Sequence, residues 1–205
     1  MTTPPANAQP LPAGETAAGG RYLIERLLGK GGMASVYAVL DTASGQRAAL
    51  KRLHAEAAPS AAPLFEREYR TLASLRHPCI VEVYDYGVDA EGPYYTMELV
   101  DGRDLSGHAP VPWRSACAYL RDVASIVGLL HARQLLHRDL SPRNLMDCDG
   151  RLKLIDFGAL ADFGRPAEVA GTPPFVPPEA LRGERLDQRA DLFALGALGY
   201  WLVTG

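Results

Sequence analysis

One short segment of the chain gathers side chains that suit the transfer of a phosphoryl group. Residues 137–144 read His-Arg-Asp-Leu-Ser-Pro-Arg-Asn, and a further acid, Asp156, follows 17 residues after Asp139. An aspartate can orient a hydroxyl and accept its proton, while an asparagine and a second aspartate supply the hard oxygen ligands that Mg²⁺ prefers when it bridges phosphate oxygens. The segment therefore indicates Asp139 as a catalytic base, with Asn144 and Asp156 as metal ligands.

The pattern of apolar residues predicts which elements hold these side chains. From Tyr22 to Val100 short β-branched and aromatic stretches predict strands, interrupted by one helix over 65–75 that His77-Pro78 ends. The predicted strands lie around residues 36–39, 48–50, 81–84 and 94–97. After residue 101 the pattern turns helical, most clearly over 114–132.

Two further predictions concern the second half of the chain. Short strands over 144–146 and 152–155 flank Asp149-Gly150, a dipeptide favoured in hairpin turns, so this hairpin would hold Asn144 and Asp156 close together. The stretch 192–203 is apolar on all faces, which predicts a buried core helix.

Composition narrows the class of protein. With 205 residues, 47% hydrophobic, the chain can bury a core as one large domain or two apposed lobes. A net charge of −3 gives no basic field for nucleic acid or anionic lipid. No apolar run approaches the ~18 residues of a membrane span, and we expect no membrane segment.

The cysteines and the start of the chain carry two more expectations. Cys79, Cys117 and Cys148 are odd in number and lack C-x-x-C spacing, so a reducing cytoplasm fits better than a disulfide framework or a zinc site. Residues 1–20 are rich in Ala, Pro, Thr and Gly and lack the features of a signal peptide. We expect a disordered leader there.

The segment 137–144 and the following Asp156-Phe157-Gly158 resemble the catalytic loop and the metal-binding motif of the protein kinase family. The resemblance implies an α+β, two-lobe fold: a β-rich N-lobe over 21–100 with one main helix, and a mainly helical C-lobe over 101–205. That C-lobe would be incomplete, lacking the last helices of the family. The Gly-Lys-Gly-Gly-Met segment and the Ala-, Pro- and Arg-rich texture look like the bacterial serine/threonine branch.

A glycine-rich segment, residues 29–36, lies between two predicted strands. Glycines let backbone N–H groups approach phosphate oxygens without a side chain in the way. Ala34 replaces the third glycine of the G-x-G-x-x-G pattern, so an ordinary strand turn remains an alternative. A dinucleotide fold would need a helix directly after the glycines, whereas a strand follows.

Lys51 ends the apolar stretch Ala49-Leu50-Lys51, where the family carries its phosphate-binding lysine. Glu68 on the following helix matches the acid that pairs with this lysine, and Glu66 competes for the role. We favour Glu68 because it lies four residues before Leu72 on the expected inward face.

The resemblance also implies an adenine site, with Met97 as gatekeeper and the backbone of Glu98 and Val100 at the adenine edge. Apolar residues would sandwich the ring. For each of these residues taken singly, core packing alone is the stronger explanation. The nucleotide-binding residues so implied are Leu28, Gly29, Lys30, Gly31, Gly32, Val36, Ala49, Lys51, Glu68, Met97, Glu98, Val100 and Met146.

Three further positions follow from the same resemblance. Thr172 looks like the substrate-side threonine of serine/threonine kinases, and Asp191 matches the buried acid that anchors the backbone of the catalytic loop. A second Asp-Phe-Gly at 162–164 has no predicted strand before it, so we expect Asp162 to be a solvated loop acid.

Ser141 departs from the family pattern, which normally places a lysine two residues after the catalytic aspartate to steady the transferring phosphoryl group. A serine supplies no charge. Arg143, four residues after Asp139, is the candidate replacement, because tyrosine kinases lack the lysine and carry an arginine there.

The resemblance implies a serine/threonine kinase that transfers the γ-phosphate of ATP, with Mg²⁺, to hydroxyls of protein substrates. Asp139, Lys51 and Arg143 would be its catalytic residues. Two alternatives stay open: a nucleotide-binding pseudokinase or scaffold fragment, and a small-molecule phosphotransferase of related fold.

The segment 158–171 contains no Ser, Thr or Tyr, so it offers no hydroxyl to a phosphate switch. We expect no activating phosphorylation within it, although Thr172 remains available for modification. Mass spectrometry of the active protein tests this expectation, and an essential phosphosite within 158–171 would refute it.

Overall fold

The computed structural model describes residues 11–57, 60–165 and 168–205, and the chain forms two compact units. Unit 1 contains the described residues up to Leu75 together with Glu82–Leu99, and unit 2 contains Arg76–Val81 and Val100–Gly205. The expected N-lobe, 21–100, included the segment 76–81, which in the structure belongs to unit 2. Backbone hydrogen bonds hold this segment there: Val81 N–H donates to the Leu154 carbonyl (3.1 Å), and Leu154 N–H donates to that of Cys79 (2.8 Å).

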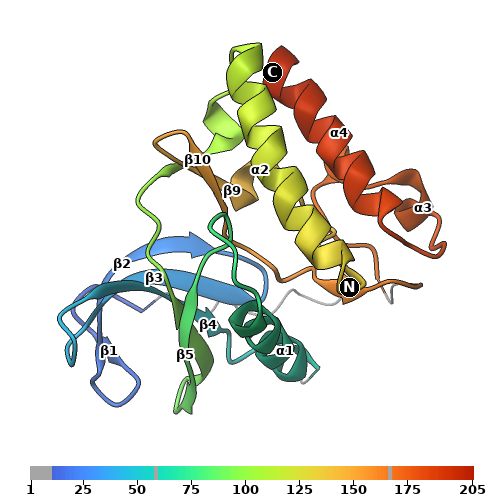
Figure 1. The fold of residues 1–205 in the computed structure, drawn as a ribbon. Coiled ribbons are helices and arrows are strands. Elements are labelled where there is room, and N and C mark those ends of the chain that lie inside the picture. Colours follow the sequence, from blue (N-terminus) through green and yellow to red (C-terminus); the bar gives the residue numbers. More distant parts are fainter. Residues whose placement is uncertain (1–10, 58–59, 166–167) are drawn as a thin grey trace, which may run out of the picture. The chain divides into compact units, whose positions relative to one another are not determined.

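A six-stranded sheet forms most of unit 1, and neighbouring strands in the order β1-β2-β3-β4-β6-β5 are antiparallel (Figure 1). Its strands are β1 Thr16–Ala17, β2 Tyr22–Lys30, β3 Ala34–Asp41, β4 Arg47–Leu53, β5 Val83–Asp89 and β6 Gly92–Met97. The stretch expected around 81–84 is therefore a strand only from Val83 onward, because Val81 belongs to unit 2 and bonds there to Leu154.

The expectation of a disordered leader is wrong for residues 11–20. Thr16 and Ala17 pair with Leu23 and Tyr22 of β2, Ala17 is buried, and Ala18 N–H donates to Asp89 Oδ2 (3.0 Å). The segment was not predicted because it has few large apolar residues, and it is held on the sheet by backbone pairing instead. Residues 1–10 lie outside the described residues.

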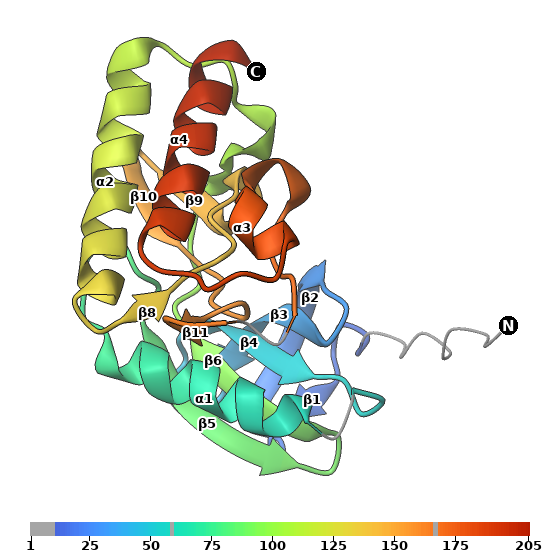
Figure 2. The same cartoon turned by 90° about the vertical axis from the view of Figure 1, so that its right-hand side faces the viewer.

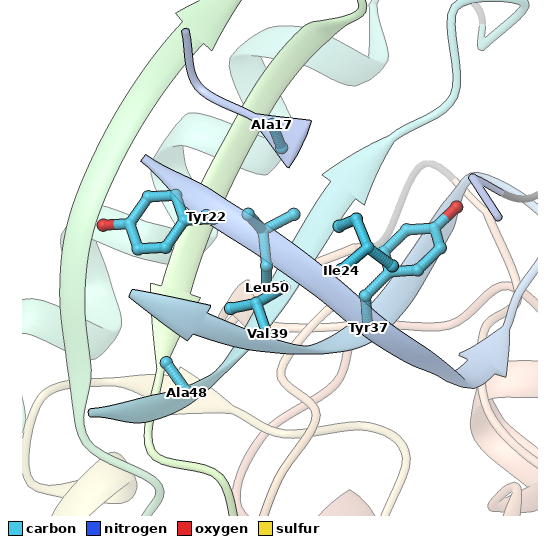
Figure 3. Close-up of a cluster of buried hydrophobic side chains, with 7 residues drawn as sticks. All are labelled: Ala17, Tyr22, Ile24, Tyr37, Val39, Ala48 and Leu50. Carbon is cyan, nitrogen blue, oxygen red and sulfur yellow. The ribbon is translucent and has the colours of Figure 1, made fainter. Parts of the chain in front are cut away.

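The two faces of this sheet carry different side chains, because successive residues of a strand point to opposite faces. One face buries an apolar cluster that Figure 3 shows together, made of Ala17, Tyr22, Ile24, Tyr37, Val39, Ala48 and Leu50. The register pairs Val36 with Lys51 and Ala49 with Met97, which places these residues on the other face. The sheet thus separates an apolar core from the face that carries Lys51.

Helix α1, Ala61–Ser74, packs on the Lys51 face of the sheet. Its buried residues include Phe65, Glu68 and Leu72, which share one side of the helix, and the Phe65 ring lies 5.0 Å from that of Tyr95 on β6. The helix begins four residues before the expected start and ends where Leu75 becomes extended.

Two long helices dominate unit 2. Helices α2, Trp113–His131, and α4, Arg189–Thr204, lie side by side (Figures 1 and 2). A Cβ added at Gly199 would lie 3.1 Å from Leu120 Cδ1, so this glycine permits their close approach. None of the helices within the described residues is long and apolar enough to cross a membrane.

Helix α4 is only partly the buried core helix expected from its sequence. Ala194, Leu198 and Leu202 are buried, but the other side of the helix exposes apolar side chains. The exposed ones are Leu192, Phe193, Tyr200 and Val203. The remaining short helical elements of unit 2 are η1 Leu105–Gly107, η2 Pro142–Asn144, η3 Pro173–Phe175 and α3 Pro178–Leu181.

The expected hairpin is confirmed as β9, Leu145–Cys148, and β10, Arg151–Leu154. Asp149 and Gly150 both have positive φ (54° and 85°), as a two-residue hairpin turn of the primed type requires. Strand β7, Arg103–Asp104, extends this sheet, and β8, Leu135–Leu136, pairs separately with β11, Ala161–Asp162.

An ion pair between Arg52 and Asp89 should make the free energy of unfolding depend on pH in the acidic range. Partial burial opposes ionisation, but the Arg52 guanidinium (Nη2–Oδ2 2.7 Å) and the Ala18 N–H together lower the pKa of Asp89 to about 2. A carboxyl whose pKa is lowered by folding stabilises the fold above its ordinary pKa, and this contribution is lost as the pH falls through the folded value. We therefore expect Asp89→Asn to lower the free energy of unfolding at pH 7 by about 2 kcal/mol.

Urea unfolding followed by circular dichroism measures this difference. It should shrink as the pH falls from about 4 to about 2, since the wild type then loses the same contribution. Glu56→Gln, which neutralises an exposed carboxylate of the same unit, serves as the control and should leave the stability unchanged within about 0.5 kcal/mol. A pH-independent difference for Asp89→Asn would contradict the account.

Candidate active site

The segment 137–144 of unit 2, which contains Asp139, is attached to a buried carboxylate. Asp191, at the start of α4, is fully buried and accepts the backbone N–H groups of His137 (3.0 Å) and Arg138 (2.9 Å). His131 Nε2 donates to the same carboxylate at 2.9 Å. Burial by itself raises the pKa of Asp191, but these donors outweigh it and hold the pKa below its usual range. The predicted anchoring of the loop by Asp191 is thus confirmed.

This attachment holds the backbone in an uncommon conformation. Arg138 has φ +69°, in the left-handed region that non-glycine residues seldom occupy. His137 is fully buried; its Nε2 donates to the Asp156 carbonyl (2.8 Å), and its Nδ1 accepts the Asp139 N–H (3.2 Å). A carbonyl only accepts and an N–H only donates, so the imidazole carries its proton on Nε2. It thereby links Asp139 to Asp156.

Both carboxylate oxygens of Asp139 have defined partners. Oδ2 accepts Asn144 Nδ2 (2.8 Å), and Oδ1 accepts the backbone N–H and the Oγ1–H of Thr172 (2.9 Å each). These donors fix the orientation of the carboxylate. The arrangement can orient a hydroxyl and accept its proton.

Asn144 and Asp156 are connected through the hairpin. The Ile155 N–H donates to the Asn144 carbonyl (3.0 Å), and the Asp156 carboxylate accepts the Gly158 N–H (3.2 Å). Because Asn144 Nδ2 serves Asp139, its amide oxygen is the atom left for a cation. An amide oxygen and a carboxylate are the hard donors that Mg²⁺ takes, so the residues fit the expected metal.

The second Asp-Phe-Gly is built into the fold in another way. Asp162 ends β11, paired with Leu135, so the expectation of a loop acid is wrong, although the residue is exposed. Phe163 packs against the apolar cluster around Leu136, and its ring lies 5.9 Å from that of His131. Periodicity did not predict β11 because the strand has only two residues.

Ser141 and Arg143 differ sharply in exposure. The Ser141 side chain is buried, and its Oγ has no hydrogen-bond partner in the described parts of the chain. Arg143 is exposed, forms no ion pair with any described residue, and lines a cavity of about 930 Å³ that Ser141 and Thr172 also line. Of these two residues, only Arg143 brings a positive charge to the cavity.

In unit 1, Lys51 pairs with Glu68. Lys51 Nζ lies 2.7 Å from Glu68 Oε1, and the two side chains are only 12% and 7% exposed. Tyr95 donates its hydroxyl to the same oxygen at 3.0 Å. Glu66, the competing candidate, instead pairs with Arg70 on the exposed side of α1. The ion pair holds the Lys51 ammonium on the sheet face opposite the apolar cluster.

The glycine-rich segment forms the hairpin between β2 and β3, and its first glycine lies two strands away from Lys51 in the sheet. Gly29 pairs with Val36, which is the register partner of Lys51, and Gly31 N–H donates to the Ala34 carbonyl (2.8 Å). A Cβ added at Gly29 or Gly32 would meet no atom within 4 Å. The hairpin therefore presents accessible backbone rather than close packing.

The remaining predicted nucleotide residues are distributed over both units. In unit 1, Leu28 and Lys30 are exposed on β2, Ala49 and Met97 are buried partners across β4 and β6, and Glu98 N–H donates to the Glu82 carbonyl (2.8 Å). In unit 2, Val100 is half-buried, and Met146 on β9 pairs with Lys153 and Asp104.

Sequence reasoning missed several contributors to the site. Tyr95 could have been found, because it lies two residues before Met97 on β6 and so shares the face of Lys51. His131 gave no such signal, since it reaches Asp191 across 60 residues of sequence. The contact between Arg138 Nη2 and the Glu168 carbonyl (2.6 Å) was also unforeseen.

Comparison with known proteins finds relatives of this chain among bacterial kinases. A probable serine/threonine-protein kinase of Streptomyces coelicolor is 39% identical over 91% of this chain and 30% of its own length. The serine/threonine-protein kinase PknB of Mycolicibacterium smegmatis is 38% identical over 90% of this chain and 32% of its own. A DNA damage-responsive serine/threonine-protein kinase, RqkA, of Deinococcus radiodurans is 36% identical over 93% of this chain and 30% of its own.

The chain thus spans about a third of the length of these curated relatives. The family model described as the protein kinase domain matches residues 22–205, which include every candidate residue above. The chain belongs to the protein kinase family.

Proposed function

We propose that the chain is a protein serine/threonine kinase that transfers the γ-phosphoryl group of ATP to a hydroxyl of a protein substrate. The observation that carries this proposal is the Asp139 carboxylate, held through both oxygens by Asn144 and Thr172. A carboxylate fixed in this way can orient a substrate hydroxyl and take its proton as the phosphoryl group arrives.

In this proposal the phosphates of ATP are held by unit 1. The Lys51 ammonium, fixed by Glu68, would bind phosphate oxygens, and the glycine hairpin would offer its backbone N–H groups. Residues that would surround the nucleotide in unit 1 are Leu28, Gly29, Lys30, Gly31, Gly32, Val36, Ala49, Met97 and Glu98.

Unit 2 would supply Val100 and Met146 to the nucleotide, and Asn144 and Asp156 to a divalent cation. When bound, such a cation neutralises the charge on phosphate oxygens. Asn144 would then serve twice, because its amide nitrogen orients Asp139 while its amide oxygen faces the cation.

The preference for Ser and Thr rests on Thr172. Its hydroxyl donates to the same Asp139 oxygen that receives its backbone N–H, so this threonine lies beside the proposed base. The names of the relatives, each a serine/threonine-protein kinase, support the same preference.

Transfer of radiolabel from γ-labelled ATP to a generic protein substrate tests the function directly. We expect labelled protein with the wild type, and a loss of about 10²- to 10⁴-fold in turnover with Asp139→Asn, because the amide cannot accept the proton. Nucleotide affinity should change less than about twofold, since Asp139 does not hold the nucleotide in this proposal.

The control is Asp149→Asn, which neutralises an exposed aspartate of the hairpin turn in the same unit and should retain full turnover. Label on a small molecule instead of protein would indicate a small-molecule phosphotransferase. Nucleotide binding without any transfer would indicate a pseudokinase or scaffold.

A second experiment tests Arg143 as the source of charge in place of the usual lysine. Arg143→Ala should lower turnover about tenfold or more while leaving ATP affinity within about twofold, because its charge acts on the group in transfer. Arg133→Ala, which removes an exposed arginine just after α2, is the matched control and should behave as the wild type. Near-normal turnover of Arg143→Ala would exclude the compensation.

A further inference from the structure

The glycine hairpin between β2 and β3 is attached to strand β4 by His54, the residue directly after that strand. The His54 N–H donates to the Met33 carbonyl at 2.8 Å, which continues the ladder one step beyond the last strand pair, Ala34 with Leu53. The imidazole adds a second bond, because His54 Nε2 lies 2.8 Å from Ser35 Oγ. The backbone and the side chain of one residue thus hold both chain neighbours of Ala34.

Ser35 is a polar residue on an apolar face. Strand alternation places it on the side of Tyr37 and Val39, which belong to the apolar cluster of Figure 3, and it is only 2% exposed. A buried hydroxyl without a partner costs free energy, and His54 supplies the partner. Because a hydroxyl can both donate and accept, the bond forms with either tautomer of the imidazole. The pair therefore joins β3 to the end of β4 in a way that an apolar residue could not.

The tip of the hairpin has little packing to fix its position. Met33 is 53% exposed, and a Cβ added at Gly32 would meet no atom of the described residues within 4 Å. A Cβ added at Gly31 would meet only the Ala34 carbonyl oxygen, at 3.5 Å. Hydrogen bonds, rather than side-chain contacts, must therefore determine where these glycines lie.

The bonds of His54 connect the two elements that would hold phosphates in the proposed function. Lys51 lies on β4, three residues before His54. On β3, Ser35 adjoins Ala34, whose carbonyl accepts the Gly31 N–H at 2.8 Å. A displacement of the β3 end from His54 would therefore shift the glycine N–H groups relative to the Lys51 ammonium.

We propose that His54 is a positioning residue, which acts through Met33 and Ser35 to hold the glycine hairpin at a fixed place relative to Lys51, so that both can contact the phosphates of one nucleotide. This inference rests on the proposed function, because that function assigns the phosphates to these two elements. If the imidazole only satisfied the buried Ser35 hydroxyl, nucleotide binding would not depend on the pair. Substitution separates the two roles.

The test uses Ser35→Ala and His54→Leu, which each remove the side-chain bond, their double variant, and His54→Gln, whose amide can reach the place of Nε2. Hydrogen–deuterium exchange of the peptide 28–36 without nucleotide, and the affinity for the ATP analogue AMP-PNP with Mg²⁺, are measured on the whole chain. We expect each single removal to accelerate the exchange and to weaken AMP-PNP binding roughly three- to tenfold, as expected for one lost hydrogen bond. The double variant should bind no more weakly than either single one, and His54→Gln should remain close to the wild type.

The loss should be specific to the phosphates. The affinity for adenosine, which lacks them, should change less than about twofold, and the KM for ATP should rise while kcat falls less than about twofold. Ser44→Ala removes an exposed hydroxyl from the turn at the opposite end of β3 and β4, so it is the matched control and should behave as the wild type.

Unchanged exchange and unchanged AMP-PNP affinity of Ser35→Ala would overturn the proposal, because the bond would then only satisfy a buried hydroxyl. Additive losses in the double variant, an equal loss of adenosine affinity, or a His54→Gln as weak as His54→Leu would overturn it as well. A wild type that binds AMP-PNP but transfers no phosphate would refute the proposed function, and the binding and exchange data would still decide the role of His54.

Discussion

The buried carboxylate of Asp191 imposes the constraint on which the conformation of the segment 137–144 depends. A charge without exposure to water is tolerated only when donors surround it, and two of its three donors are consecutive backbone N–H groups, those of His137 and Arg138. Meeting that requirement fixes the loop: Arg138 takes a positive φ, and His137 bonds to the carbonyl of Asp156. The strain at Arg138 is a local cost that the anchored carboxylate offsets.

Unit 1 also buries charged side chains, and there they lie on one face of a sheet. Lys51 and Glu68 are mostly buried charges that stabilise each other, and Tyr95 supplies a further hydrogen bond to Glu68. The strand alternation keeps this polar group on one face and the apolar cluster around Leu50 on the other. A buried ion pair and an apolar core can therefore occupy adjacent positions of one strand.

The sequence was most informative where chemistry or periodicity is local. The choice of Glu68 over Glu66 followed from helical spacing, and the hairpin at Asp149 followed from its turn residues. Strand β1 was not predictable, because its two residues are held by backbone pairing and lack an apolar pattern. Contacts between distant segments, such as His131 with Asp191, depend on how helices pack and leave no trace in spacing.

The register of β4 has a consequence for how the chain can vary in length. Val36 lies opposite Lys51, and Leu50 lies opposite Tyr37 within the apolar cluster. Inserting or deleting one residue within β4 would turn the ammonium toward the apolar cluster and a leucine toward Glu68. Natural variation in length is therefore expected in the turn after Asp41, where exposed residues connect β3 to β4, and not within the strand itself.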